Sequence, residues 1–193
     1  MSHHVLRPLA LLAVGAIALA CGASPPPAPA SPSSPTTTTG ALGASSSKKI
    51  FVKHDPAWAA CHATYQAVST DLVAESRRSG TGCEAVTKMK PILRPQNGTQ
   101  ADTNPPQEVK FEGKAGSCYR VYAMADAGIK DLDLLLKDST GAIAAEDSTD
   151  DASPVLAEDG AFCFKEIDDV TLIVSVGAGK GSWALEIWSD EPR

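Results

Sequence analysis

The fold is decided by residues 170–188, VTLIVSVGAGKGSWALEIW. Large apolar residues stand at every second position in each half of this stretch: Leu172, Val174 and Val176, then Trp183, Leu185 and Ile187. A period of two puts alternate side chains on opposite faces of a β-strand, so each half predicts a strand with one buried face. Glycines separate the two halves, and we therefore predict two strands, 170–176 and 182–188, joined by a turn.

The region upstream of this stretch continues the same pattern. Strands are predicted at 107–113, 117–125, 131–137, 142–146 and 161–165. Gly, Asp, Ser and Pro residues separate them, as is typical of turns. About seven short strands predict a mainly β fold, an antiparallel β-sandwich or jelly roll over residues 107–193. A parallel α/β sheet would need helices between the strands, and no helical pattern fits there.

Residues 48–106 predict a short helical segment followed by a loop. Apolar side chains recur at spacings of three and four: Trp58, Cys61, Tyr65, Val68 and Leu72. This stripe predicts one helix that begins at the cap Asp55 and ends at Gly80. Arg77 and Arg78 would lie near its C-terminal end, where cations interact favourably with the helix dipole.

A second short helix is predicted over residues 84–90, with Val86 and Met89 directed inward. The stretch that follows, residues 91–106, is rich in Pro, Asn and Gln and predicts a loop. Its residues 97–99, NGT, match a glycosylation sequon, and we interpret them as a turn.

The two tryptophans of the last predicted strand are expected to have different surroundings. Trp183 and Trp188 fall on opposite faces of a regular strand, so only one of them can face the core of the sandwich. We expect Trp188 to pack against the helical segment. The alternative is an exposed ring that contacts sugar or protein.

The N-terminal segment has the features of an export signal. In residues 1–20, one basic residue, Arg7, precedes an apolar run of 12 residues, Leu9–Ala20. As a helix, this run would span about 18 Å, which is less than the ~30 Å hydrocarbon core of a bilayer. We therefore predict a signal peptide and not a membrane-spanning helix.

A cysteine follows this signal directly. Residues 17–21, IALAC, resemble the lipobox of bacterial lipoproteins. The resemblance implies that Cys21 carries the lipid that anchors the chain in the cell envelope, and that Gly22 permits transfer to the outer membrane. The alternative is a plain signal peptide with a chance cysteine. Residues 21–47 are almost entirely Gly, Ala, Ser, Pro and Thr, which predicts a disordered tether that extends from the lipidated cysteine.

The charge balance excludes one class of partner. The chain has 17 Lys and Arg against 23 Asp and Glu, and only Arg7 precedes Cys21, so the chain from Cys21 onward has a net charge of −7. Proteins that bind nucleic acid need a basic face, and we expect no nucleic-acid partner. The acidic residues concentrate in 131–170, which carries 12 Asp and Glu against 2 Lys.

Four cysteines remain when Cys21 is set aside: Cys61, Cys83, Cys118 and Cys163. An even number of cysteines in an exported chain predicts two disulfides. Three pairings are possible, and we favour Cys61–Cys83 with Cys118–Cys163 because each pair falls within one predicted region. A zinc or haem site is disfavoured, because no CxxC pair is present and only His54 and His62 follow the signal.

Acidic residues form the one candidate metal site. Asp131 and Asp133 are predicted on the same face of a strand, Asp138 in the turn that follows, and Asp147 in the next loop. Carboxylate oxygens are the ligands that Ca²⁺ prefers, so these four residues are candidate calcium ligands. No other cofactor is expected. The alternative is a solvated acidic edge that keeps the sheet from aggregating.

Several short motifs of the β region resemble a known family. They are residues 116–121, GSCYRV, residues 131–134, DLDL, residues 160–163, GAFC, and residues 179–185, GKGSWAL. This succession is similar to the bacterial pre-peptidase C-terminal domain, and to myxobacterial-type lipoproteins that carry such a domain behind a cysteine-bearing helical segment. The resemblance implies a non-catalytic β-sandwich module, in which Cys118 and Cys163 lie on neighbouring strands.

We therefore expect a membrane-anchored lipoprotein that displays a non-catalytic binding or structural module in the envelope. Its partners would be the membrane, through the lipid, and an envelope protein or polysaccharide. A calcium-dependent adhesion or matrix-binding module is the main alternative. A secreted hydrolase is disfavoured, because no G-x-S-x-G or H-E-x-x-H motif is present and both histidines lie in the helical segment.

Overall fold

The computed structural model describes residues 46–63, 65–147 and 149–191. The predicted signal peptide, Cys21 and the tether as far as residue 45 lie outside the described residues. Within them the chain forms two helices and ten strands. In chain order these are β1 (Ile50–His54), α1 (Pro56–Ala63), α2 (Leu72–Thr87), β2 (Lys90–Pro91), β3 (Gln96–Ala101), β4 (Gln107–Gly113), β5 (Cys118–Ala125), β6 (Ile129–Lys137), β7 (Ile143–Glu146), β8 (Val155–Leu156), β9 (Gly160–Phe164) and β10 (Asp168–Ser189).

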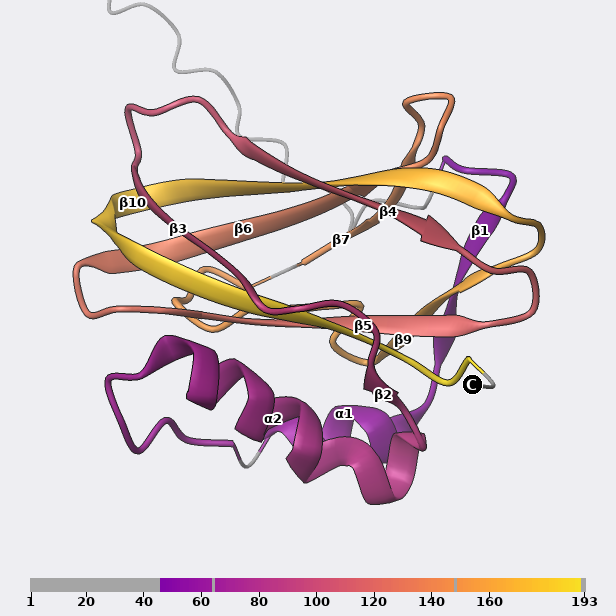
Figure 1. Cartoon of the computed structure of the whole chain (residues 1–193), viewed down its shortest axis with the longest axis horizontal. Helices are drawn as coiled ribbons and strands as arrows, with labels where there is room; N and C mark the ends of the chain where they lie inside the picture. Colours follow the sequence, from indigo (N-terminus) through magenta and orange to yellow (C-terminus); the bar gives the residue numbers. More distant parts are fainter. Residues whose placement is uncertain (1–45, 64, 148, 192–193) are drawn as a thin grey trace, which may run out of the picture. The chain divides into compact units, whose positions relative to one another are not determined.

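The strands form two antiparallel sheets that pack face to face (Figure 1). One sheet has the order β1-β9-β5-β10-β3, with β8 paired to β5 and β2 paired to β10. The other has the order β4-β10-β6-β7. We call them the helix-side sheet and the open sheet. The predicted mainly β, antiparallel sandwich is confirmed.

The strand β10 belongs to both sheets. Its first part pairs with β4 and β6 in the open sheet, and its second part pairs with β5 and β3 in the helix-side sheet. The prediction of two separate strands, 170–176 and 182–188, is therefore wrong. The register against β6 shifts on either side of Ala178, and Gly179 has a φ of 98°. At this bulge Gly179 lets the strand bend from the open sheet into the helix-side sheet. The strand therefore continues through the glycines and does not end at them.

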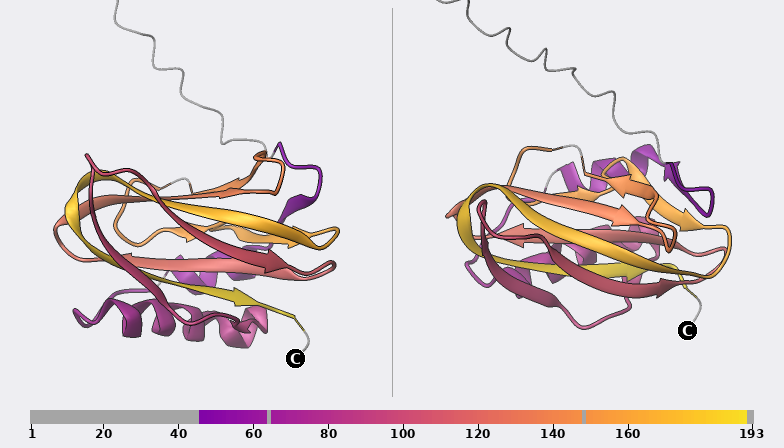
Figure 2. Two further views of the ribbon diagram at one scale, coloured as in Figure 1. Left: turned by 45° about the horizontal axis from the view of Figure 1, so that its top comes forward. Right: turned by 90° about the horizontal axis from the view of Figure 1, so that it is seen from above.

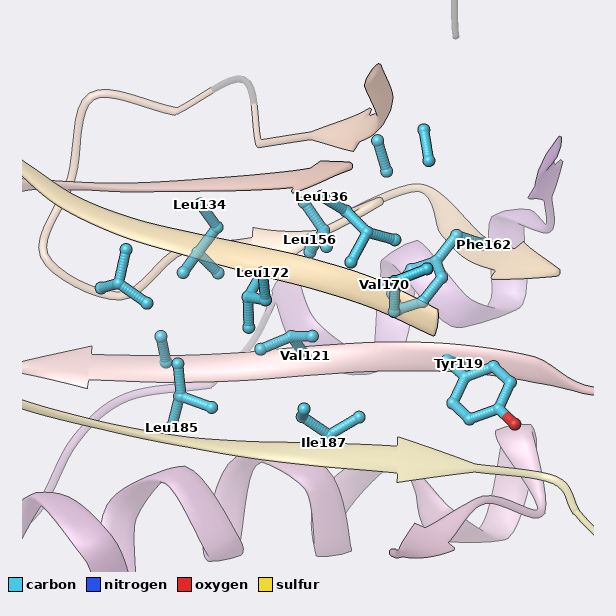
Figure 3. Close-up of a cluster of buried hydrophobic side chains, with 14 of the residues drawn as sticks. Tyr119, Val121, Leu134, Leu136, Leu156, Phe162, Val170, Leu172, Leu185 and Ile187 are labelled. Carbon is cyan, nitrogen blue, oxygen red and sulfur yellow. The ribbon is translucent and has the colours of Figure 1, made fainter. Parts of the chain in front are cut away.

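The main core lies between the two sheets (Figure 3). Its fully buried side chains include Tyr119, Val121, Leu134, Leu136, Leu156, Phe162, Val170, Leu172, Leu185 and Ile187. In residues 170–176 the predicted alternation is confirmed, because the apolar positions are buried and those between them only partly. In residues 183–188 both faces are buried, so the prediction of one buried face is wrong there: Trp183, Leu185 and Ile187 join the main core, and the other face lies under the helices. Burial of these side chains removes apolar surface from water and supplies the main stabilisation of the sandwich.

The strand β3 occupies part of the region that was predicted to be a loop. Residues 97–99, interpreted as a turn, pair with β10 instead, and Gly98 lies opposite Trp183. A Cβ atom on Gly98 would lie 2.8 Å from the indole of Trp183, so the glycine leaves room for that ring. The outer edge of β3 is capped by side chains, because Asn104 accepts from Ala101 N at 2.8 Å.

The helices form a third layer that covers the outer face of the helix-side sheet (Figures 1 and 2). A second hydrophobic core fills the space between them: Trp58, Cys83, Met89, Cys118, Tyr122, Val155, Ala161, Cys163 and Trp188. Trp188 is 1% exposed and packs under α2, which confirms the expectation that it contacts the helical segment. Nearby, Arg77 on α2 donates to both carboxylate oxygens of Glu186 at 2.7 Å and fixes the helix to β10.

The single long helix predicted from Asp55 to Gly80 is wrong. The helix α1 ends at Ala63, and α2 begins at Leu72 after a connecting segment that is not helical. Asp71 has extended backbone angles and accepts from Ala74 N at 3.1 Å, so it caps α2. The apolar stripe favours one continuous helix, whereas Ser69-Thr70-Asp71 favours a new helix start. In the structure a new helix starts after Asp71.

Further details of the helical prediction also change. Gly80 does not stop the helix but lies inside α2, where a Cβ atom would be 2.2 Å from the Trp188 ring. Residues 84–87 continue α2, so the predicted second helix is wrong. Val86 is 43% exposed and not inward, whereas Met89 is fully buried as expected. No helix among the described residues is long and apolar enough to cross a bilayer.

Two disulfides are present, and both have the favoured pairing. Cys61 and Cys83 join α1 to α2, and Cys118 and Cys163 join β5 to β9. The second pair stands directly opposite in the strand register. Both bonds lie in the core between the helices and the helix-side sheet. One crosslinks the two helices, and the other crosslinks two strands of the sheet beneath them.

Candidate functional site

A concave surface in the helical layer lies where α1, the connecting segment 65–71 and α2 meet. This groove has a volume of about 580 Å³. It is lined chiefly by Cys61, Tyr65, Gln66, Val68, Arg78 and Ser79. We call it the interhelical groove. The groove was not predicted from the sequence, because the connecting segment was predicted to be helical.

Glu75 organises one wall of the groove. Its carboxylate is 2% exposed and accepts from the hydroxyl of Tyr65, from Val68 N at 3.2 Å and from Arg78 at 2.9 Å. The hydrogen bond from Tyr65, followed by that from Arg78, lowers the pKa of Glu75 to about 2. The buried charge therefore holds the connecting segment against α2.

His62 on α1 and Ser79 on α2, which lines the groove, lie close together. Ser79 Oγ lies 3.3 Å from His62 Nδ1, and burial together with the charge of Arg120 lowers the pKa of His62. The neutral imidazole can accept a proton from the serine hydroxyl, as a general base would. However, Ser79 is only 2% exposed, so its hydroxyl is enclosed between α1 and α2. In this position the pair links the two helices.

Arg120 is a buried cation that anchors α1. Its side chain is fully buried and donates to Trp58 O at 2.9 Å and to Glu158 O at 2.8 Å. It also lies 3.7 Å from Cys61 Sγ. Burial lowers the pKa of this guanidinium, since the charge has left water without a hydrogen-bonded carboxylate. Strand periodicity alone would place Arg120 on an outer face, and only the helical layer makes that face buried.

Three of the four predicted calcium ligands influence one another. Asp131 and Asp133 stand on the solvent face of β6, and Asp147 Oδ2 accepts from Leu134 N at 2.5 Å. Burial, followed by the charges of Asp133 and Asp131, raises the pKa of Asp147 to about 6. Burial and neighbouring acids also raise the pKa values of Asp131 and Asp133.

The fourth predicted ligand, Asp138, has a different role. It follows the opposite end of β6 from Asp131 and closes a turn by accepting from Thr140 N at 2.9 Å and Ala142 N at 3.0 Å. The four predicted ligands therefore do not form one group. Among the described residues, no group of three or more His, Cys, Asp or Glu is arranged to hold a metal ion. Calcium binding stays a prediction.

Asp147 gives a testable pH dependence. Its folded-state pKa of about 6 exceeds the ordinary value of 3.8, so the folded state binds more protons between these values. Its contribution to stability is therefore present below pH 4 and is lost as the pH rises through 6. The parent should lose this stability between pH 4 and pH 7, whereas Asp147→Asn should not. We therefore expect the unfolding free energy of Asp147→Asn minus that of the parent to rise by about 1–2 kcal/mol over this range, as measured by urea unfolding.

Asp126→Asn is the control, because the pKa of Asp126 is shifted in the opposite direction. Ser182 N and Gly128 N donate to Asp126 at 2.7 and 2.9 Å and lower its pKa. Because this pKa lies below the ordinary 3.8, Asp126 is ionised in both the folded and the unfolded state above about pH 5. The variant should therefore be less stable than the parent by a nearly constant amount up to pH 7, and the difference should shrink only as the pH falls below about 4. Parallel pH profiles for the two variants would contradict the assignment of the slope to Asp147.

The fold and the groove together define a disulfide-fastened β-sandwich with a helical layer on one face. No protein-family model and no curated protein matches this chain.

Proposed function

We propose that this chain is a lipid-anchored protein of the cell envelope, which displays its sandwich as a non-catalytic binding or structural module. The observation that carries the proposal is the pairing of the cysteines. The four described cysteines are bonded to one another as Cys61–Cys83 and Cys118–Cys163, so none of them is left to pair with Cys21. Two disulfides suit an oxidising compartment, and this pairing leaves Cys21 as the candidate for acylation.

The resemblance to the pre-peptidase C-terminal domain is part of the same proposal. That family implies a β-sandwich accessory module, and an antiparallel sandwich with Cys118 and Cys163 on neighbouring strands supports it. The interhelical groove supports a binding role, because it is a concave surface with an aromatic ring, Tyr65, and an exposed apolar side chain, Val68, which is 75% exposed. An envelope protein or polysaccharide is the proposed partner.

The anchor is tested by replacing the acylated residue in a bacterial host. Wild-type protein should incorporate radiolabelled palmitate and remain in the membrane fraction. We expect Cys21→Ala to incorporate none and to appear in the soluble extracytoplasmic fraction, because two or three acyl chains hold a protein on a bilayer almost permanently.

Cys61→Ala/Cys83→Ala is the control, since it removes two other cysteines and leaves the anchor. This variant should still be labelled and remain in the membrane. Equal labelling of the wild-type protein and Cys21→Ala would refute the lipid anchor.

A further inference from the structure

Five exposed side chains gather around the edge strand β1 and the turn between β9 and β10. They are Lys48, Phe51, Lys53, Lys165 and Ile167. We call this set the β1 surface. Phe51 is 41% exposed and Ile167 is 63% exposed, which places both among the most exposed large apolar residues. The Lys165 ammonium lies 5.9 Å from the centre of the Phe51 ring and donates to Lys48 O at 3.0 Å. Cations and apolar groups are therefore interleaved on this surface.

The three lysines of the β1 surface form no ion pair within the described part of the chain. Lys49, their neighbour, is different, because its ammonium contacts Asp168 at 2.7 Å and Glu166 at 3.4 Å. Acidic side chains near these lysines contact other basic groups: Glu166 lies 3.4 Å from Lys49, and Asp159 lies 2.7 Å from His54. In a chain of net negative charge, this surface therefore offers cations to an anionic partner.

The β1 surface also lies where the chain enters the folded domain. Ser46 is the first described residue, and its backbone N–H donates to Ile143 O at 2.8 Å, two residues before Lys48. Twenty-four residues, 22–45, separate it from Cys21. For the tether predicted from the composition of these residues, this length corresponds to an end-to-end distance of about 25–30 Å. A lipid on Cys21 would therefore hold the β1 surface within reach of the bilayer, at a high effective concentration.

We propose that the β1 surface docks on the anionic phosphate headgroups of the bilayer in which Cys21 is anchored. Lys48, Lys53 and Lys165 contact the phosphates, and Phe51 and Ile167 enter the interfacial region between them. Each lysine near an anionic surface favours the docked state by a factor of about five. This inference rests on the lipid anchor proposed above and adds an orientation: the edge strand β1 faces the membrane.

The test uses the chain from Cys21 onward, whose other four cysteines are bonded. Its free Cys21 thiol is coupled to a maleimide lipid in vesicles of phosphatidylcholine, with or without phosphatidylglycerol. Hydrogen–deuterium exchange is then measured by mass spectrometry. We expect slower exchange in residues 48–54 and 165–167 on the anionic vesicles, and this protection should disappear on phosphatidylcholine and in molar salt.

Charge variants test whether the lysines of the β1 surface cause the protection. Lys48→Gln/Lys165→Gln should reduce the equilibrium constant for docking about thirtyfold and abolish the protection. Lys130→Gln/Lys180→Gln, which removes two exposed lysines outside the β1 surface, should leave it intact. Equal protection on the two kinds of vesicle, or unchanged protection in Lys48→Gln/Lys165→Gln, would overturn the inference. Because the coupling is chemical, this result is independent of whether cells acylate Cys21.

Discussion

Replacing Cys118 and Cys163 together with alanine is expected to lower the free energy of unfolding by about 4 kcal/mol. The bond joins residues 45 apart in the chain, so its removal restores the freedom of a long loop in the unfolded state. In the folded state the two residues stand opposite each other on β5 and β9, with Cα atoms 4.0 Å apart. The loss should appear as a lower midpoint in urea unfolding under non-reducing conditions.

The second disulfide is the control for this prediction. Cys61 and Cys83 are 22 residues apart, so removing that bond should lower the free energy of unfolding by about 3 kcal/mol, less than the first. Its main structural effect should be confined to α1 and α2, since the bond joins only these elements. A larger loss for Cys61→Ala/Cys83→Ala than for Cys118→Ala/Cys163→Ala would contradict the loop-length argument.

Two glycines of α2 are expected to respond to the same substitution with opposite signs. A Cβ atom on Gly80 would lie 2.2–2.5 Å from three atoms of the Trp188 indole. That ring is 1% exposed, and its N–H donates to Glu186 at 3.2 Å, so it has little room to move. We therefore expect Gly80→Ala to lower the free energy of unfolding by about 2 kcal/mol, because overpacking outweighs the gain in helix propensity.

Gly82 lies in the same helix, is exposed, and has no atom within 4 Å of an added Cβ. Gly82→Ala should therefore raise the free energy of unfolding by about 0.5–1 kcal/mol through helix propensity alone. Thermal melting of both variants measures the difference directly. Stabilisation by both substitutions would show that α2 does not pack closely on Trp188.

The strands could be predicted where a period of two was strong. Leu134 and Leu172 occupy the inward positions that their alternation predicted. The polar strand β3 has no such pattern, and it forms because β10 offers it a ladder of backbone hydrogen bonds. Gly98 was misinterpreted for a related reason. The absence of a side chain at Gly98 leaves space for the Trp183 ring. A sequence does not show which side chain will lie opposite a glycine.

The helical layer could be predicted only in part. The apolar stripe continued past Ala63, but the local competition from Ser69-Thr70-Asp71 and the buried carboxylate of Glu75 broke the helix. Cys61 and Cys83 were paired correctly because both lie in the same region of the sequence. The interhelical groove could not be predicted, since it exists only because the chain between α1 and α2 is not helical.

The position of β10 has a consequence for the export that we propose. This strand ends at Ser189, close to the C-terminus, and five other strands pair with it: β2, β3, β4, β5 and β6. If the N-terminus crosses the membrane first, β10 crosses after the other nine described strands. Neither sheet can be completed until that strand arrives, since contacts so distant in sequence form late. The sandwich would therefore stay unfolded, and able to pass through a narrow pore, until β10 has crossed.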